Sequence, residues 1–195
     1  FAEGWHRGGG QKGLLPSSRL ANIAALKHPL SVDTYIDQTL SGARGILIRL
    51  IGGVPYWPYG LQQIRALADA RGIALAVLPA DGRADSRLDE ISTLPVSTLR
   101  RLTHLCDTGG VVAAQAVLAQ LALAAGLYAG PVPGAKGVPP LGAWTPETGP
   151  IRTVAAAGLP KTSEIKPRIA IVFYRSYLVA ADIAPITALF AAFRA

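Results

Sequence analysis

The clearest pattern along the chain is an apolar run, then a helical period, then a second apolar run. The first run, "GILIRLI" from Gly45, has no helical period and is rich in β-branched residues, as expected of a strand buried on both sides. Apolar positions recur at helical spacing over Tyr59–Arg71, and Gly72 ends that helix. The second run, "IALAVLP" over Ile73–Pro79, reads as another buried strand. This order predicts a βαβ unit with parallel strands.

Helices are predicted on both sides of this unit. Before it, we expect helices over Ser17–His28 and Val32–Ser41, the second with Ser31 as its N-cap. After it, the pattern predicts a short helix capped by Asp85, a helix after Pro95, and an Ala-rich helix in the stretch Val111–Gly130. That last stretch approaches the length of a bilayer span, but it contains Gln and Gly and has no flanking Lys or Arg. We therefore expect it to lie inside the protein and predict no membrane span.

Shifts in composition divide the chain into four predicted segments. Residues 1–16 are rich in glycine and are expected to be flexible, and residues 17–127 form an α/β subdomain. Residues 128–167 form a Pro/Gly-rich linker, and residues 168–195 supply a strand, "RIAIVFYR", and a helix of a second α/β subdomain. The predicted fold class is thus α/β: parallel-sheet βαβ layers of the flavodoxin or Rossmann kind with helices, plus the start of a second subdomain. Since both ends read as excerpts, we expect a piece of a longer protein.

Composition and charge exclude several classes of protein. Hydrophobic residues make up 50% of the 195 residues and charged residues 16%, which excludes a disordered segment. The net charge is +7, but the basic residues are scattered singly rather than gathered in a stripe, so no nucleic-acid partner is expected. Cys106 is the single cysteine, which points to a reducing, cytoplasmic location and to a small buried apolar residue rather than a reactive thiol.

Familiar catalytic and metal-binding motifs are missing. None of the glycine-rich stretches has the spacing of a phosphate-binding loop, and the three histidines stand far apart, so no metal site is predicted. The acidic cluster of Asp81, Asp85, Asp89 and Glu90 alternates with arginines and is interpreted as a solvated loop and helix start. No nucleophile and base stand in a recognisable pattern, so the catalytic residues stay unknown.

One loop, "IGGVPYWPYG", has positive arguments for ligand binding. It follows the carboxyl end of a predicted parallel strand and leads into a helix N-terminus, which is where ligands bind in open α/β sheets. Its prolines restrict the backbone, so its rings are held with little entropy left to lose. The candidate ligand-binding residues are Gly52, Gly53, Tyr56, Trp57, Tyr59 and Gly60. The alternative is that the rings fill the core or pack on another domain.

Two stretches of the chain resemble a known family. Over Ser17–Pro95, the "KHP-S-D-Y" pattern and the "GG-YWPYG" loop make the chain similar to the N-terminal region of the large subunit of ATP-dependent cobaltochelatase. The later "IAIVFYRSYLVAADIAPITALFAAF", Ile169–Phe193, resembles the strand, loop and helix that open that family's next region. The H subunit of magnesium chelatase is a more distant relative.

The resemblance implies a role in cobalamin biosynthesis. The family's large subunit holds hydrogenobyrinic acid a,c-diamide while cobalt is inserted, and AAA-type ATPase subunits couple the insertion to ATP hydrolysis. The resemblance therefore implies these partners for the full-length subunit, with ATP and cobalt used by the whole complex. We expect no cofactor bound by this stretch and no activity of the stretch alone. Three alternatives stay open: a segment of a magnesium chelatase H-type subunit, a docking module for partner subunits, and a flavodoxin-like cofactor binder.

Overall fold

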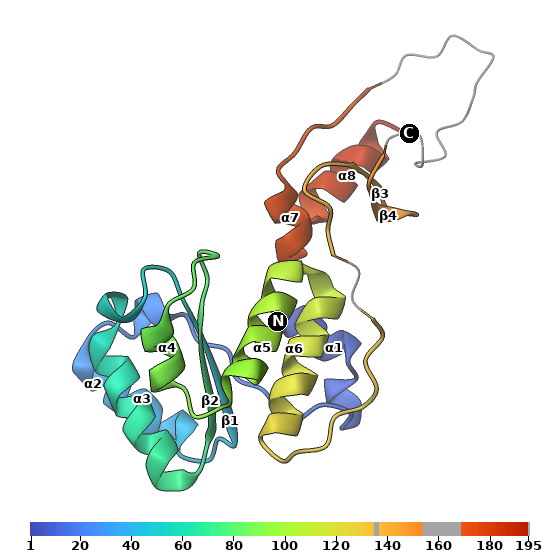
Figure 1. Cartoon of the computed structure of the whole chain (residues 1–195). Coiled ribbons are helices and arrows are strands. Elements are labelled where there is room, and N and C mark those ends of the chain that lie inside the picture. Colours follow the sequence, from blue (N-terminus) through green and yellow to red (C-terminus); the bar gives the residue numbers. More distant parts are fainter. Residues whose placement is uncertain (135–136, 154–168, 195) are drawn as a thin grey trace, which may run out of the picture.

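The computed structural model describes residues 1–134, 137–153 and 169–194 (Figure 1). The first part is an α/β unit with the strands β1 (Gly45–Leu50) and β2 (Ala74–Pro79). Its helices are α1 (Ala2–Arg7), α2 (Pro29–Tyr35), α3 (Pro58–Arg71), α4 (Ser86–Ile91), α5 (Val96–Thr108) and α6 (Gly110–Ala124). Shorter helical turns are η1 (Gly10–Lys12), η2 (Ile23–Ala25), η3 (Ile36–Leu40) and η4 (Val54–Tyr56).

The predicted βαβ unit is confirmed. β1 and β2 pair in parallel, from Gly45 opposite Ala74 to Leu50 opposite Pro79, and α3 connects them. Gly72 ends α3 in the left-handed conformation that glycine adopts without strain. The chain is thus a mixed α/β structure with a parallel sheet. Because the parallel sheet has two strands among the described residues, the strand order that defines a flavodoxin or Rossmann fold stays a prediction.

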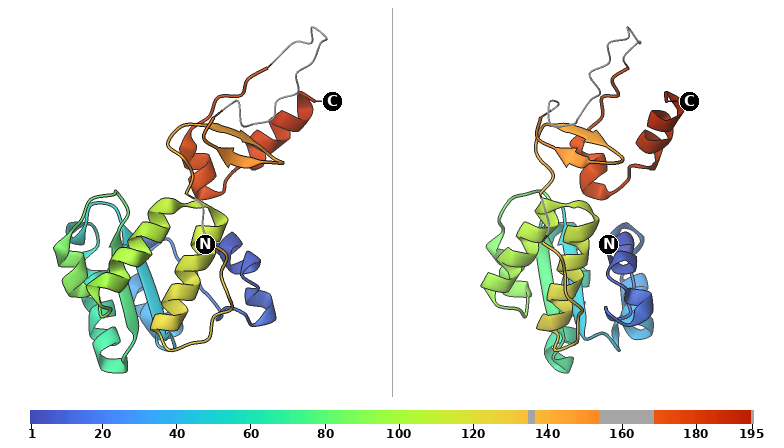
Figure 2. Two further views of the ribbon diagram at one scale, coloured as in Figure 1. Left: turned by 45° about the vertical axis from the view of Figure 1, so that its right-hand side comes forward. Right: turned by 90° about the vertical axis from the view of Figure 1, so that its right-hand side faces the viewer.

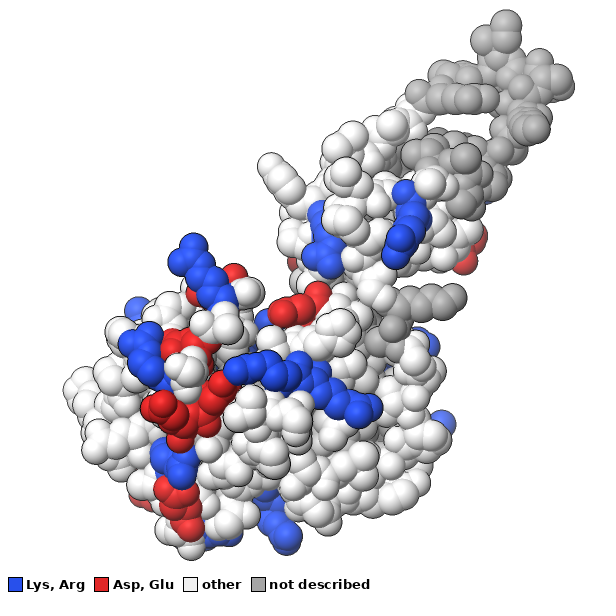
Figure 3. Space-filling model, in the orientation of Figure 1, with Lys and Arg blue, Asp and Glu red and all other residues white. Residues whose placement is uncertain are grey.

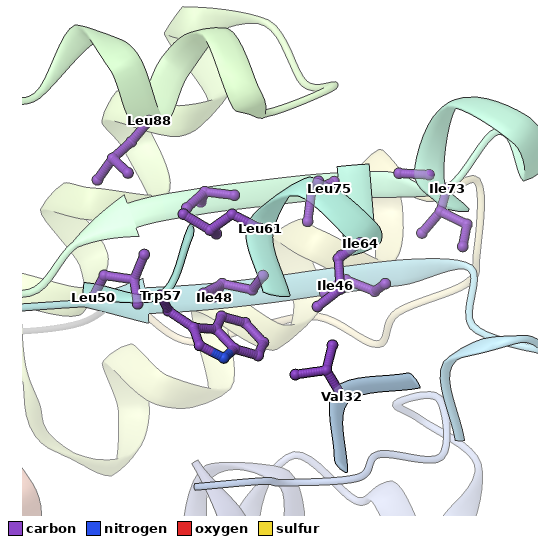
Figure 4. Close-up of a cluster of buried hydrophobic side chains, with 12 residues drawn as sticks. Val32, Ile46, Ile48, Leu50, Trp57, Leu61, Ile64, Ile73, Leu75 and Leu88 are labelled. Carbon is purple, nitrogen blue, oxygen red and sulfur yellow. The ribbon is translucent and has the colours of Figure 1, made fainter. Parts of the chain in front are cut away.

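Helices cover both faces of the sheet and enclose two apolar cores. On one face, Ile46, Ile48 and Leu50 of β1 pack with residues of α2, α3 and α4 (Figure 4). On the other face, Ala76 and Leu78 of β2 pack against α5 and α6. All six residues of β2 are buried, as predicted, whereas in β1 buried residues alternate with half-buried ones. The result is a layer of helices on each side of a sheet.

A second, smaller part lies beyond one end of α5 and α6 (Figures 1 and 2). It contains an antiparallel hairpin, β3 (Ala143–Thr145) and β4 (Gly149–Ile151), and the helices α7 (Arg175–Ala180) and α8 (Ala184–Ala192). The guanidinium of Arg175 donates hydrogen bonds to the carbonyl oxygen of Val138, at 2.9 and 3.1 Å. Val179 of α7 packs against Gly109, at the junction of α5 and α6.

Several predicted elements differ in the structure. The predicted helix over Ser17–His28 is wrong: only η2 forms, because the Asn22 side chain accepts the N–H of Ala24 and starts a short turn. The helix predicted to begin after Ser31 begins at Pro29 instead. His28 is its N-cap, with Nδ1 accepting the N–H of Leu30, and proline suits the first helical turn.

The two ends of the chain also differ from expectation. Residues 1–16, expected to be flexible, include the helix α1, which packs on α6 with Gly4 against Gln115 and with Leu15 buried. In the predicted strand "RIAIVFYR", residues 169–174 form no strand, because their backbone pairs with no strand among the described residues. The division of the chain into four segments stays a prediction, and residues 154–168 of the predicted linker lie outside the described residues.

The Ala-rich stretch folds as expected of a helix inside the protein. α6 ends at Ala124, and its buried side chains face α1, α5 and β1. Within the described part of the chain, no helix is both long and apolar enough to cross a membrane.

The outer edge of β2 is closed by side-chain hydroxyls instead of a third strand. Oγ of the buried Ser92 accepts the N–H of Val77 at 2.9 Å and donates to the carbonyl of Leu88 at 2.8 Å. Oγ1 of Thr93 accepts the N–H of Leu75 at 2.8 Å and donates to the carbonyl of Ile73 at 2.8 Å. The two residues thereby satisfy the backbone groups that point away from β1.

Replacing Ser92 by Ala is expected to lower the free energy of unfolding by about 1 to 3 kcal/mol, because the N–H of Val77 loses its partner while it stays buried. Ser97 is exposed on the first turn of α5, so Ser97→Ala is the matched control, with an expected change within about 0.5 kcal/mol. Urea denaturation of both variants checks this. Equal stabilities would show that the Ser92 hydroxyl does not hold the edge of β2.

Candidate functional site

Two loops meet at the carboxyl edge of the parallel sheet. The first follows β1 and runs from Ile51 to Trp57, and the second follows β2 and leads to α4. Between them lies a hollow of about 330 Å³. It is lined by Gly52, Gly53, Pro79, Asp81, Arg83, Ala84, Asp85, Arg87 and Leu88. This is the edge at which ligands bind in parallel α/β sheets.

The first loop requires its two glycines. Gly52 and Gly53 have φ of 89° and 68°, in the region that other residues avoid. A Cβ on Gly53 would stand 2.6 Å from Oδ2 of Asp85, so the two loops touch at this point. The backbone of Gly53 therefore forms part of the wall of the hollow, with no side chain between it and a bound molecule.

The second loop supplies charge. The side chain of Asp85 caps α4 by accepting the N–H of Arg87, and it also accepts bonds from Nε and Nη2 of Arg87, at 3.0 and 2.9 Å. The Arg87 guanidinium lowers the pKa of the Asp85 carboxyl below its usual value. Asp81 accepts the backbone N–H of Arg83. Among the described residues, the guanidinium of Arg83 has no hydrogen-bond or ion-pair partner, so it is free to bind a carboxylate.

The lowered pKa of Asp85 predicts a dependence of stability on pH. A carboxyl whose pKa is lower in the folded state stabilises the fold above its unfolded value of about 3.9, and this contribution is lost as pH falls through the folded pKa. Asp85→Asn keeps a side-chain oxygen to cap α4 but cannot titrate. Urea denaturation between about pH 2 and pH 6 is therefore expected to show a shallower acid destabilisation in the variant. If the free energy of unfolding fell with pH equally steeply in both proteins, the Asp85 and Arg87 pair would not be the source of the acid destabilisation.

The three predicted rings, Tyr56 and Trp57 of the first loop and Tyr59 at the start of α3, do not all face the same way. Trp57 is only 6% exposed and lies in the core between β1, α2 and α3 (Figure 4). Its Nε1 donates to the carbonyl of Leu26 at 2.7 Å. Gly60 lies beneath the indole, where a Cβ would stand 2.1 Å from its nearest atom. Trp57 and Gly60 therefore anchor the loop to the core and do not face the hollow.

Tyr59 also faces inward. It packs at the border of the core, and its hydroxyl donates to both carboxylate oxygens of Asp33 on α2, at 2.9 and 3.0 Å. This bond to Asp33 raises the pKa of the Tyr59 phenol above its ordinary value. Tyr59 thus joins the start of α3 to α2.

Tyr56 is the ring of this loop that faces solvent. Tyr56 is 52% exposed, and Ile51, at the start of the same loop, is 67% exposed. Both belong to the same short loop as Gly52 and Gly53, which line the hollow. Ile51 and Tyr56 thus add exposed apolar surface to the loop that lines the charged hollow, and this combination suits a flat molecule with acidic groups at its rim.

The structure thus divides the six predicted site residues into two groups. Gly52, Gly53 and Tyr56 lie at the solvent-facing edge of the sheet, whereas Trp57, Tyr59 and Gly60 build the core beneath it. The sequence analysis missed the second loop, because its alternating acids and arginines were interpreted as a solvated helix start. Its place directly after a buried parallel strand was the signal that could have identified it, since the carboxyl ends of parallel strands share one edge.

Within the described ranges, the other titratable groups do not gather at a second site. Acidic and basic side chains alternate over the face that carries α3, α4 and α5 (Figure 3), and they pair as Arg65 with Asp69 and Arg100 with Asp89. Burial raises the pKa of the Cys106 thiol, so it stays protonated at neutral pH, in accord with an apolar role. Across the described residues, no three His, Cys, Asp or Glu side chains gather as metal ligands would.

Comparison with known proteins identifies similar sequences. Over 193 aligned residues, the chain is 33% identical to the aerobic cobaltochelatase subunit CobN of a Sinorhizobium species, and the match covers 92% of this chain. Over 96 residues, it is 42% identical to the subunit of the same name from Pseudomonas aeruginosa, which covers 49% of this chain. No family model matches the chain. The resemblance found in the sequence is confirmed.

A solved structure supports the fold. The chain matches the catalytic subunit of cobaltochelatase from Mycobacterium tuberculosis with a TM-score of 0.59 over 88% of this chain. At 20% identity this match shows the fold alone. The chain spans 14% and 8% of the two similar sequences and 12% of the solved chain, so it corresponds to a small part of each.

Proposed function

We propose, because the chain matches a segment of CobN-type cobaltochelatase subunits, that it forms part of the macrocycle-binding subunit of a cobalt-inserting enzyme. In this proposal the enzyme acts in the cytoplasm in cobalamin biosynthesis. It inserts cobalt into hydrogenobyrinic acid a,c-diamide at the expense of ATP, together with AAA-type ATPase subunits. The proposed role of this segment is to frame the macrocycle, not to carry out the insertion.

One observation carries the proposal: an exposed ring and a free guanidinium lie at the same edge of the sheet. Tyr56 and Ile51 offer an apolar surface, and Arg83 lines the adjoining hollow without a partner in the described part of the chain. The macrocycle is a flat, partly amidated acid, so it presents both a ring face and carboxylates. Aromatic side chains stack on such faces, and arginine binds carboxylates through two parallel hydrogen bonds.

The proposal assigns different roles to neighbouring residues of one loop. Tyr56 and the backbone of Gly52 and Gly53 would contact the macrocycle, and Trp57 and Gly60 would hold the loop in place. The pair of Asp85 and Arg87 fixes the opposite wall, since it ties the loop after β2 to the start of α4. A ligand at this edge would therefore meet a preformed surface, which lowers the entropy lost on binding.

Isothermal titration of the full-length subunit with the macrocycle tests this role. Tyr56→Ala combined with Arg83→Gln is expected to weaken binding by about tenfold or more, since one stacking contact and one ion pair are lost. The matched control is Arg101→Gln, which removes an exposed arginine of α5 that is absent from the lining of the hollow. Melting temperatures of both variants should stay at the wild-type value.

Unchanged affinity of the Tyr56 and Arg83 double variant would remove this edge from the macrocycle site. A variant that binds the macrocycle normally but no longer inserts cobalt with the ATPase subunits would favour the docking role instead. In that case the exposed apolar side chains of Ile51 and Tyr56 would be a contact surface for a partner subunit.

A further inference from the structure

We infer that the free edge of β1 receives a third strand from a part of the CobN-type polypeptide outside this chain. The strand is extended, mainly apolar and parallel to β1. Contacts of the sheet and of the helices around it carry the inference, and macrocycle binding plays no part in it.

The sheet can grow on one side only. On the outer side of β2, Ser92 and Thr93 hold the N–H groups of Val77 and Leu75, and the N–H of Thr93 donates to the carbonyl of Leu75. Pro79, at the end of the same strand, has no N–H to offer. These residues end the sheet at β2.

The other side of the sheet is open. The register shows that the backbone groups of Ile46, Ile48 and Leu50 point toward β2, because the N–H of Ala74 bonds to Arg44 and that of Ala80 to Leu50. The groups of the alternate residues, Gly45, Leu47 and Arg49, therefore point away from β2. Among the described residues, β1 pairs with no strand other than β2.

The helices beside β1 extend past its open edge. α5 packs against β2, α6 packs against β1, and α1 packs on α6. Figure 1 shows these three helices in one row, with α1 at the end of the row farthest from the strands. This layer therefore has three helices beside a sheet of two strands, so that, among the described residues, α1 has no strand to cover. A mainly apolar hollow of about 100 Å³ remains beside α1, lined in part by Trp5, Leu20 and Leu118.

An unsatisfied donor lies on the same strand. Nε of Arg49 is buried and has no hydrogen-bond partner among the described residues, and Nη2 lies 3.7 Å from Oδ1 of Asp107. A buried N–H group without a partner costs free energy, so such groups are rare in complete structures. A neighbouring strand or the loop that follows it would bring an acceptor to this place.

The occupant follows from the size of the similar proteins and from the kind of sheet. The Sinorhizobium and Pseudomonas CobN chains have 86% and 92% of their length outside the match, so ample polypeptide exists to supply a strand. A sheet with helices on both faces is normally parallel and buried, and its strands are apolar. Two strands alone are a marginal sheet, which a third strand would complete.

Amide hydrogen exchange tests the inference in two proteins. In the 195-residue chain alone, the N–H groups of Leu47 and Arg49 are expected to exchange about a hundredfold faster than those of Ile46, Ile48 and Leu50. In the full-length CobN of the Sinorhizobium species, the aligned groups of both sets are expected to be equally protected. The neighbouring residues of β1 serve as the internal control in each protein.

Three outcomes would overturn the inference. Equal protection of both sets in the chain alone would show that the edge is already closed. Fast exchange of the aligned groups in the full-length subunit would show that the edge stays free. Protection that rises with the concentration of the 195-residue chain would show that a second copy, not another part of the polypeptide, occupies the edge.

Discussion

Replacing Trp57 by Ala is expected to lower the free energy of unfolding by about 3 to 5 kcal/mol, the largest effect of any single change in the loop after β1. The indole is buried among β1, α2 and α3, and its Nε1 holds the carbonyl of Leu26, 31 residues earlier in the chain. Its removal leaves a cavity and frees the segment that joins η2 to α2. Urea denaturation measured by circular dichroism checks the size of the effect.

One further variant separates the apolar contact of the indole from its hydrogen bond, and a second serves as a control. Trp57→Phe keeps most of the apolar contact and loses the bond to Leu26, so a loss of about 1 to 3 kcal/mol is expected. Tyr56→Ala removes the exposed ring that directly precedes Trp57. Its free energy of unfolding is expected to stay within about 0.5 kcal/mol of the wild-type value. If Tyr56→Ala destabilised the chain as much as Trp57→Ala, the assignment of one ring to the core and one to solvent would be wrong.

Replacing Gly60 by Ala is expected to lower the free energy of unfolding by about 1 to 3 kcal/mol, although alanine is the better helix former. In an open helix the same change would stabilise by about 1 kcal/mol. At Gly60, however, the new Cβ would stand 2.1 to 2.5 Å from three atoms of the Trp57 ring, which is buried and cannot move aside freely. Thermal unfolding of the single variant gives the sign of the effect.

A second background tests the cause of that sign. In a Trp57→Leu chain the indole is gone, so Gly60→Ala is expected to become neutral or stabilising. The difference between the two backgrounds measures the coupling of Gly60 to the indole. A change that destabilises both backgrounds equally would place the cause in the helix backbone instead of the Trp57 ring.

The central βαβ unit was predictable from the sequence because each of its parts has a local cause. β1 and β2 are runs of apolar residues with no polar face, and Gly72 fixes the end of α3 through its own conformational freedom. Asp85 caps α4 as expected, since a carboxylate before a helical run accepts the first free N–H groups. In these cases a residue and its near neighbours decide the outcome.

Elements that depend on distant partners were not predictable. The stretch around η2 has apolar residues at helical spacing, but Ile23 and Leu26 pack on the core as a short turn, and the carbonyl of Leu26 is taken by Trp57. Residues 169–174 have the composition of a strand, but a strand forms only beside another strand. Local patterns do not contain this information.

The candidate site shows the same division. The sequence placed the loop of Gly52 and Gly53 at the carboxyl edge of β1, and the structure agrees. It could not say which ring faces solvent, because the three rings stand within four positions and the choice is made by Gly60 and Leu26. The contribution of Arg83 needed the register of β1 and β2, which brings the second loop beside the first.

Oxidative labelling of Tyr56 in the full-length subunit, with and without the macrocycle, tests the proposed function most directly. Because Tyr56 is exposed in the structure, its ring is expected to be oxidised readily in the free subunit and to be protected when hydrogenobyrinic acid a,c-diamide binds. Tyr128, which is also exposed and is absent from the lining of the hollow, should be oxidised equally in both states. Equal oxidation of Tyr56 with and without bound macrocycle would contradict the proposal that this edge of the sheet contacts it.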